Sequence, residues 1–149
     1  MRCVPTLKAS VPETMNDCKY QHYVFNTYKS RSVLIDPDVI KFLYDSFNVI
    51  AKTKGFKIIA CRILGDHVHC LIKYNSRHKR DYIIRMLKGI SARKFFRKFP
   101  KTNRFVYRKL WARSYFASEI EADKIYKVIN YIKSQIDNSG FDKRYKLMK

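Results

Sequence analysis

Residues 67–74 contain two histidines separated by a single residue. If this segment is a β-strand, successive side chains point to opposite faces, so His67 and His69 stand side by side, roughly 7 Å apart along the strand. The other face then carries the apolar set Val68, Cys70, Ile72 and Tyr74. Two imidazoles so placed can bind one divalent ion such as Mn²⁺, Zn²⁺ or Ni²⁺, and Mg²⁺ is possible if oxygen ligands and water complete the shell. Because a His-x-His pair also occurs in strands that bind no metal, a purely structural role stays open.

A tyrosine near the C-terminus is the second group that could do chemistry. An apolar stripe of residues 125, 128, 129, 132 and 136 predicts an amphipathic helix over 122–137. Tyr131 and Gln135 lie on one flank of that stripe at (i, i+4) spacing, whereas Tyr126 lies on the opposite flank and is expected to pack. A phenol can act as a nucleophile when neighbouring groups assist it. The alternative is an ordinary surface tyrosine.

The elements that would position these groups follow a regular order. Strands are expected at 20–28, 56–64, 67–74 and 110–118, with a Gly65-Asp66 turn joining the middle two. Helices are expected at 37–55, from an Asp36-Pro37 start to Gly55, and from about 80 to 100, with a break or kink at 89–91. The order β-α-β-β-α-β-α predicts an α+β, ferredoxin-like antiparallel sheet, with two helices on one face and the final helix free to approach the open face.

The net charge of the chain indicates the kind of molecule that it binds. The chain of 149 residues has 32 Lys and Arg against 12 Asp and Glu, a formal net charge of +20. Between Arg77 and Arg113 there are fourteen basic residues and one acid, interleaved with aromatic residues. Basic side chains neutralise phosphates and flat rings can stack on unpaired bases. This segment is therefore the predicted DNA-binding surface, with Lys88, Arg93, Lys94 and Arg97 as expected phosphate contacts and Lys124 and Lys127 adding charge beside Tyr131.

Length and composition restrict the class of protein. The chain fits one domain, predicted at 19–149, and residues 1–18 are expected to form a flexible extension. There is no apolar run long enough to span a membrane and no apolar core of a signal peptide. Four cysteines without a C-x-x-C spacing support neither a zinc ribbon nor a redox site. A cytoplasmic protein is expected.

Several short segments, taken in order, resemble one known family. They are Gly65-Asp66-His67-Val68-His69, Leu87-Lys88-Gly89, Leu110-Trp111 with Tyr115-Phe116, and Tyr131-Ile132-x-x-Gln135. Each is weak alone, but the ordered set, spanning about 20–135, is similar to the single-tyrosine HUH transposases, the TnpA-type enzymes of the smallest bacterial and archaeal insertion sequences.

The resemblance implies an activity and roles for particular residues. It implies that His67, His69 and Gln135 bind a divalent ion, Mg²⁺ or Mn²⁺, and that Tyr131 attacks single-stranded DNA. The result would be a covalent 5′-phosphotyrosine intermediate that is later rejoined to a new end. It also implies recognition of DNA hairpins at element ends, and a homodimer in which the tyrosine helix of one subunit completes the site of the other.

Two alternatives remain from the sequence. One is an HUH nickase of the replication-initiator type, which would use the same metal and tyrosine. The other is a non-enzymatic nucleic-acid-binding protein of ferredoxin-like fold, although the aromatic run of an RNA-recognition sheet is lacking. Only the enzymes would form a covalent protein–DNA adduct.

Overall fold

The computed structural model describes residues 18–100 and 109–135. Its central feature is a four-stranded antiparallel sheet in the order β2-β3-β1-β4. The strands are β1 (Cys18–Asn26), β2 (Lys57–Ile63), β3 (His67–Asn75) and β4 (Phe116–Ile120). This order confirms the ferredoxin-like prediction. Cys18, assigned to the extension from the sequence, is the first residue of β1, and residues 1–17 lie outside the described part.

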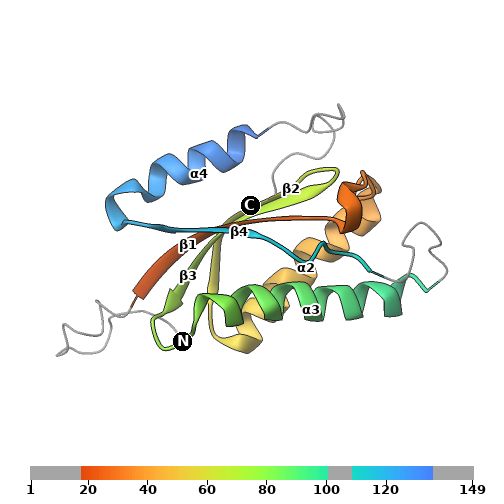
Figure 1. Cartoon of the computed structure of the whole chain (residues 1–149), viewed down its shortest axis with the longest axis horizontal. Coiled ribbons are helices and arrows are strands. Elements are labelled where there is room, and N and C mark those ends of the chain that lie inside the picture. The colour runs from red at the N-terminus through yellow and green to blue at the C-terminus, as the bar shows by residue number, and fades with distance from the viewer. Residues whose placement is uncertain (1–17, 101–108, 136–149) are drawn as a thin grey trace.

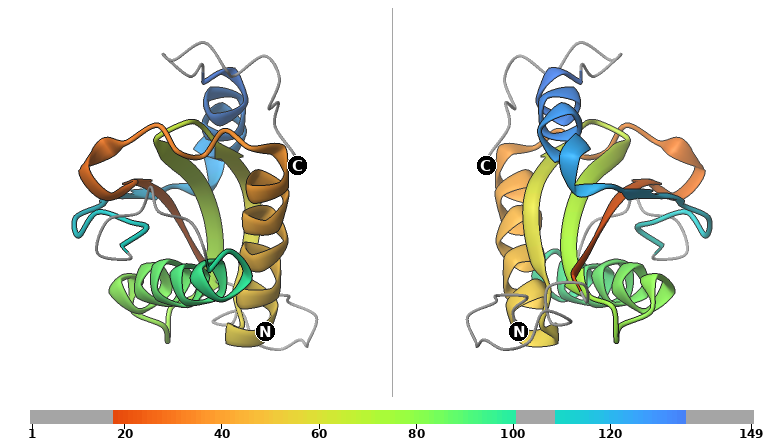
Figure 2. Two further views of the ribbon diagram at one scale, coloured as in Figure 1. Left: turned by 90° about the vertical axis from the view of Figure 1, so that its right-hand side faces the viewer. Right: turned by 90° about the vertical axis from the view of Figure 1, so that its left-hand side faces the viewer.

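Helices lie on both faces of the sheet, two on one face and one on the other. Helices α2 (Pro37–Lys54) and α3 (Arg80–Lys98) cover one face, and α4 (Ile125–Ser134) crosses the other (Figure 1). Figure 2 shows the same three layers from the two ends. The larger core lies between the sheet and α2 and α3, and a small one, centred on Ala60, Leu71 and Ile132, lies under α4. No helix in the described ranges is long and apolar enough to cross a membrane.

Helix α2 begins and ends where the sequence predicts. The Asp36 carboxylate accepts a hydrogen bond from the backbone N–H of Asp38 at 2.8 Å, and Pro37 occupies the first helical position. Gly55 closes the helix in the left-handed region at φ 85°, donating to the Ala51 carbonyl.

The kink expected in α3 at residues 89–91 is wrong. The helix runs unbroken from Arg80 to Lys98, because Ser91 continues the buried stripe between Leu87 and Phe95. A hydroxyl is tolerated in this core position because Ser91 Oγ accepts a hydrogen bond from the Trp111 indole N–H at 2.9 Å. The apolar pattern appeared to change phase in the sequence because one position of the buried stripe is a serine, whose hydroxyl bonds a buried side chain.

The fourth strand is also displaced from its predicted place at 110–118. Trp111 forms an isolated bridge with Thr27, but regular pairing starts at Phe116 and continues to Ile120. Between these points the Lys88 ammonium donates to the carbonyl oxygens of Arg113 and Ser114, at 3.1 and 3.3 Å. Those carbonyls thus point to α3 instead of into the sheet ladder.

Candidate functional site

Strand β3 presents its histidines to the α4 side of the sheet. Val68, Cys70 and Ile72 belong to the larger core on the opposite face, as the alternation predicts. The rings of His67 and His69 lie with their centroids 5.1 Å apart. The two imidazoles therefore form one cluster on the face that α4 covers.

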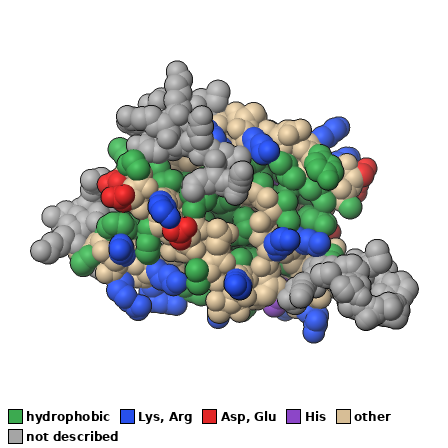
Figure 3. Space-filling view, turned by 180° about the vertical axis from the view of Figure 1, so that it is seen from behind, with side chains coloured by type: hydrophobic (Ala, Val, Ile, Leu, Met, Phe, Trp, Pro, Cys, Tyr) green, Lys and Arg blue, Asp and Glu red, His purple; other side chains and the backbone are tan. Residues whose placement is uncertain are grey.

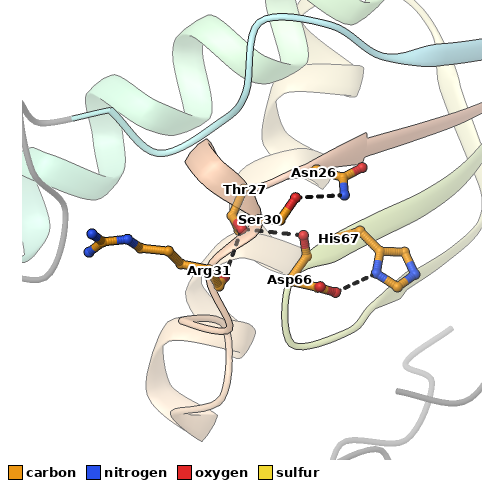
Figure 4. Close-up of polar contacts among 6 residues, drawn as sticks. All are labelled: Asn26, Thr27, Ser30, Arg31, Asp66 and His67. Atoms are coloured by element: carbon orange, nitrogen blue, oxygen red, sulfur yellow. Dashed lines mark hydrogen bonds and ion pairs between the residues drawn. The ribbon is translucent and has the colours of Figure 1, made fainter. Parts of the chain in front are cut away.

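His67 is oriented by the turn that precedes it. Its Nδ1 lies 2.7 Å from Asp66 Oδ1 (Figure 4). The backbone carbonyl of Asp66 in turn accepts hydrogen bonds from the backbone N–H of Thr27 at 2.9 Å and from its hydroxyl at 3.3 Å. The turn is thus fixed to the end of β1, and the carboxylate is held against the imidazole. A carboxylate accepts the hydrogen bond here, so a neutral His67 donates from Nδ1 and has its lone pair on Nε2.

His69 is more deeply placed, with 5% of its surface exposed. Burial, followed by the charges of His67, His22 and Arg62, lowers the pKa of His69 to about 3. The ring is accordingly neutral near pH 7, which is the form that binds a metal ion. Its Nδ1 lies 3.1 Å from Nε2 of His22, a buried residue of β1.

Helix α4 brings Tyr131 to this cluster. Ile132 is the one fully buried residue among 125–134, and it packs on Ala60 and Leu71, with Ile125, Val128 and Ile129 partly buried beside it. The adjacent Tyr131 ring then lies 5.8 Å from the ring of His69, centroid to centroid, and half of the tyrosine remains exposed. Tyr126 was expected to pack, but it is 79% exposed, because nothing in the described ranges covers its flank of the helix.

Gln135 lies at the end of α4, one turn beyond Tyr131. The helix ends at Ser134, earlier than the predicted residue 137, and Gln135 has an extended backbone. Its side-chain nitrogen donates to the Tyr131 carbonyl at 3.3 Å, and the Ser134 hydroxyl donates to the same oxygen at 2.9 Å. These two bonds satisfy a terminal carbonyl of the helix. The amide nitrogen is therefore engaged by the helix end, whereas the amide oxygen is the atom that could bind a metal ion.

The geometry of the two histidines fits a shared divalent ion. An imidazole bound through Nε2 has its centroid roughly 3.2 Å from the ion, given an N–metal distance of about 2.1 Å. Centroids 5.1 Å apart are therefore close enough for both rings to reach one ion. Within 18–100 and 109–135 no cluster of three or more His, Cys, Asp or Glu could hold a metal. The structure thus brings two imidazole donors together, and Gln135 and water as further ligands stay a prediction.

The residues expected to contact DNA lie on both sides of the sheet. Arg93, Lys94 and Arg97 belong to α3, on the face opposite the histidines, whereas Lys124 and Lys127 are exposed at the start of α4. Lys88 is half-buried and holds the carbonyls before β4, and burial lowers the pKa of its ammonium. On the face in Figure 3, Lys and Arg side chains are spread widely and acidic ones are few.

The chain matches the family model described as "Transposase IS200 like" over residues 14–135. The chain belongs to this transposase family. It is 26% identical over 118 residues to the ISDra2 transposase TnpA of Deinococcus radiodurans, a match that covers 78% of this chain and 84% of that protein.

Two solved structures resemble this member of the IS200-like family. One, from Deinococcus radiodurans R1, is described as a candidate transposase. It has a TM-score of 0.65 and 26% identity, covering 90% of this chain and 99% of the other. The other is a REP-associated tyrosine transposase bound to a REP hairpin, with a TM-score of 0.58 and 19% identity, covering 77% of this chain and 64% of that one. The second likeness shows the shared fold.

The structure adds residues that sequence reasoning missed. His22 and Arg62 both reach the histidine face, from β1 and β2: His22 contacts His69, and Arg62 pairs directly opposite His69 in the ladder. Neither stands in a recognisable spacing with the His-x-His pair, since each comes from another strand. A signal was present for His22, because a histidine in the middle of a predicted strand requires a polar partner if it is buried.

Proposed function

We propose that this transposase cleaves and rejoins single-stranded DNA, with Tyr131 as nucleophile and His67, His69 and Gln135 as ligands of a divalent ion, Mg²⁺ or Mn²⁺. The observation that carries the proposal is the contact of the Tyr131 ring with His69 on the face where two imidazoles converge. The half-exposed phenol can be reached by a DNA strand. His69, whose ring lies beside it, is neutral near pH 7, and the Nδ1 nitrogen of His67 is engaged by Asp66, which leaves Nε2 to face a metal ion.

The chemical step conserves the phosphodiester bond energy. The phenolic oxygen of Tyr131 attacks the phosphorus, a Tyr–O–P bond forms, and the P–O3′ bond breaks. The departing oxygen takes up a proton to become a free 3′-OH, and the phenol proton is lost to water. A different 3′-OH then reverses the step and restores the tyrosine. When bound, a divalent ion would polarise the phosphate and offset the charge that develops on it.

Hairpin recognition and a homodimer are part of the same proposal. Hairpin binding is favoured by the net charge of +20 and by the neighbour whose bound nucleic acid is a REP hairpin. In the single chain, α4 lies over its own sheet through a small contact, in which Ile132 is fully buried and Ile125, Val128 and Ile129 are partly buried. Such a small contact would allow α4 to leave, so that Tyr131 could enter the site of a partner subunit.

Covalent capture separates this proposal from a non-enzymatic nucleic-acid binder. The purified protein is incubated with single strands from both sides of its own gene, with Mn²⁺ or Mg²⁺, and the products are separated under denaturing conditions. We expect a protein–DNA adduct at the 5′ end of the downstream product and a free 3′-OH on the upstream product. Transfer of the bound strand to a second 3′ end would distinguish strand transfer from simple nicking. DNA that is bound but never cut would contradict the proposal.

A further inference from the structure

His22 lies in the middle of β1 on the same face as the two candidate ligands. It is 8% exposed, and its Nε2 is 3.1 Å from Nδ1 of His69. The ring centroids are 5.3 Å apart and the planes are inclined by 23°, so the two nitrogens face each other roughly along the line between the ring centres. His22 also contacts the Tyr131 ring, with centroids 5.9 Å apart.

One proton lies between these two nitrogens, and its position decides whether His69 can bind a metal. If His22 donated, the neutral His69 would carry its own proton on Nε2, and that nitrogen would have no lone pair to offer. If His69 donates from Nδ1, its Nε2 is a free donor. A contact of 3.1 Å between the two nitrogens requires that one of them lacks a proton and accepts from the other.

The neighbouring ligand is arranged in the same way. His67 Nδ1 faces the Asp66 carboxylate at 2.7 Å, which can only accept. Metal-binding histidines generally donate their second ring nitrogen to such an acceptor, which fixes the tautomer and the ring orientation. For His67 the acceptor is the Asp66 carboxylate of the adjoining turn. For His69 the nitrogen placed to accept is Nε2 of His22 on the neighbouring strand.

We propose that His22 is a positioning residue for the metal site: its Nε2 accepts the Nδ1 proton of His69 and thereby presents the His69 Nε2 lone pair to the ion. The inference rests on the proposed function, because it takes His69 as a ligand. His22 itself does not bind the ion, since its Nε2 is directed at His69.

Two substitutions separate hydrogen bonding from packing. His22→Gln keeps an acceptor oxygen near the position of Nε2, whereas His22→Phe keeps a ring and removes the acceptor. We expect His22→Phe to weaken Mn²⁺ binding about 10- to 100-fold, as loss of such a partner generally does, and His22→Gln to stay within about threefold of the original protein. Isothermal titration calorimetry with Mn²⁺ alone measures both. His78→Phe is the matched control, because the His78 ring lies on Tyr82, away from the site.

The tautomer can be measured in the metal-free protein without DNA. Long-range ¹H–¹⁵N spectra of the histidine rings should show His69 protonated at Nδ1 and His22 unprotonated at Nε2. In His22→Phe, part of the His69 population should move its proton to Nε2. Near-ultraviolet circular dichroism establishes that each variant is folded.

Several results would overturn the inference. They are a His69 ring protonated at Nε2 in the unsubstituted protein, equal Mn²⁺ affinities for His22→Phe and the unsubstituted protein, and equal losses in the Gln and Phe variants. None of these depends on cleavage. Conversely, a protein with the expected tautomer and Mn²⁺ affinities that forms no DNA adduct would contradict the proposed strand transfer and leave the role of His22 standing.

Discussion

The ring of Tyr131 on α4 lies edge-on to the ring of His69 on β3, with centroids 5.8 Å apart and planes inclined by 78°. Sixty-two positions of sequence separate these residues, and the contact depends on the packing of Ile132 on Ala60 and Leu71. A phenol and a neutral imidazole therefore lie in contact on the face of the sheet that α4 covers, within a single chain.

The metal site should be separable from DNA binding. His69→Ala removes one of the two imidazole donors, so cleavage and Mn²⁺ binding should both be lost, while hairpin binding changes little because the phosphates contact basic side chains elsewhere. Chelation of the original protein should give the same loss, reversed by added Mn²⁺. His78→Ala serves as the control histidine. A His69→Ala protein that cuts normally in chelator-treated, Mn²⁺-supplemented buffer would place the site elsewhere.

The basic face of α3 should govern salt dependence. Each phosphate contact contributes about 0.7 to 0.9 to the slope of log affinity against log salt. Replacing Arg93 and Arg97 by Ala should lower that slope by roughly one to two for single-stranded or hairpin DNA. Lys52→Ala with Lys57→Ala, which removes two exposed charges from other elements, is the matched control. Equal slopes in the two double variants would move the DNA surface away from α3.

Exchange of α4 between subunits can be tested by mixing. A His69→Ala chain and a Tyr131→Phe chain are each inactive, but a heterodimer with exchanged helices contains one site with both intact residues. The mixture should then regain part of the original cleavage rate. If α4 stays on its own sheet in the active protein, as it lies in the single chain, each heterodimer site lacks one group and the mixture remains inactive.

Arg62 should be replaceable without loss of stability. Its side chain is 6% exposed, Nε has no partner, and no hydrogen bond or ion pair within 18–100 and 109–135 engages the guanidinium. A buried guanidinium nitrogen without a hydrogen-bond partner is costly, so Arg62→Met should leave the free energy of unfolding unchanged or raise it by about 1–2 kcal/mol. Urea unfolding measures the change, with Arg85→Met, an exposed position on α3, as the charge control. A loss of more than about 1 kcal/mol would mean that Arg62 is structurally paired.

Much of the fold could be predicted because local signals agreed with the final packing. Alternation in residues 67–74 placed the histidines on the face opposite the larger core, and the Asp36 and Gly55 signals set the limits of α2. The errors arose where a polar residue had a distant partner. Ser91 interrupts the apolar pattern of α3 in the sequence, but in the structure its hydroxyl accepts a hydrogen bond from Trp111. Lys88 binds carbonyl oxygens of the segment before β4, which therefore do not join the sheet ladder.

The site was predicted in part for the same reason. His67, His69 and Tyr131 have periodic positions in one strand and one helix, so the sequence assigns their faces. His22 depends on the register of β1 against β3, where it pairs with Leu71 and reaches His69 diagonally. No spacing within the chain specifies that register.

The central claim is that Tyr131 forms the covalent bond to DNA, and peptide mapping of the trapped adduct tests it most directly. The adduct is digested and the peptide that carries the nucleotide is sequenced. We expect the nucleotide on Tyr131, with Tyr131→Phe folding, binding DNA and forming no adduct. Tyr126→Phe should keep full activity, because that side chain is 79% exposed and lies on the other flank of the helix from Tyr131. A nucleotide on any peptide that lacks Tyr131 would contradict the mechanism.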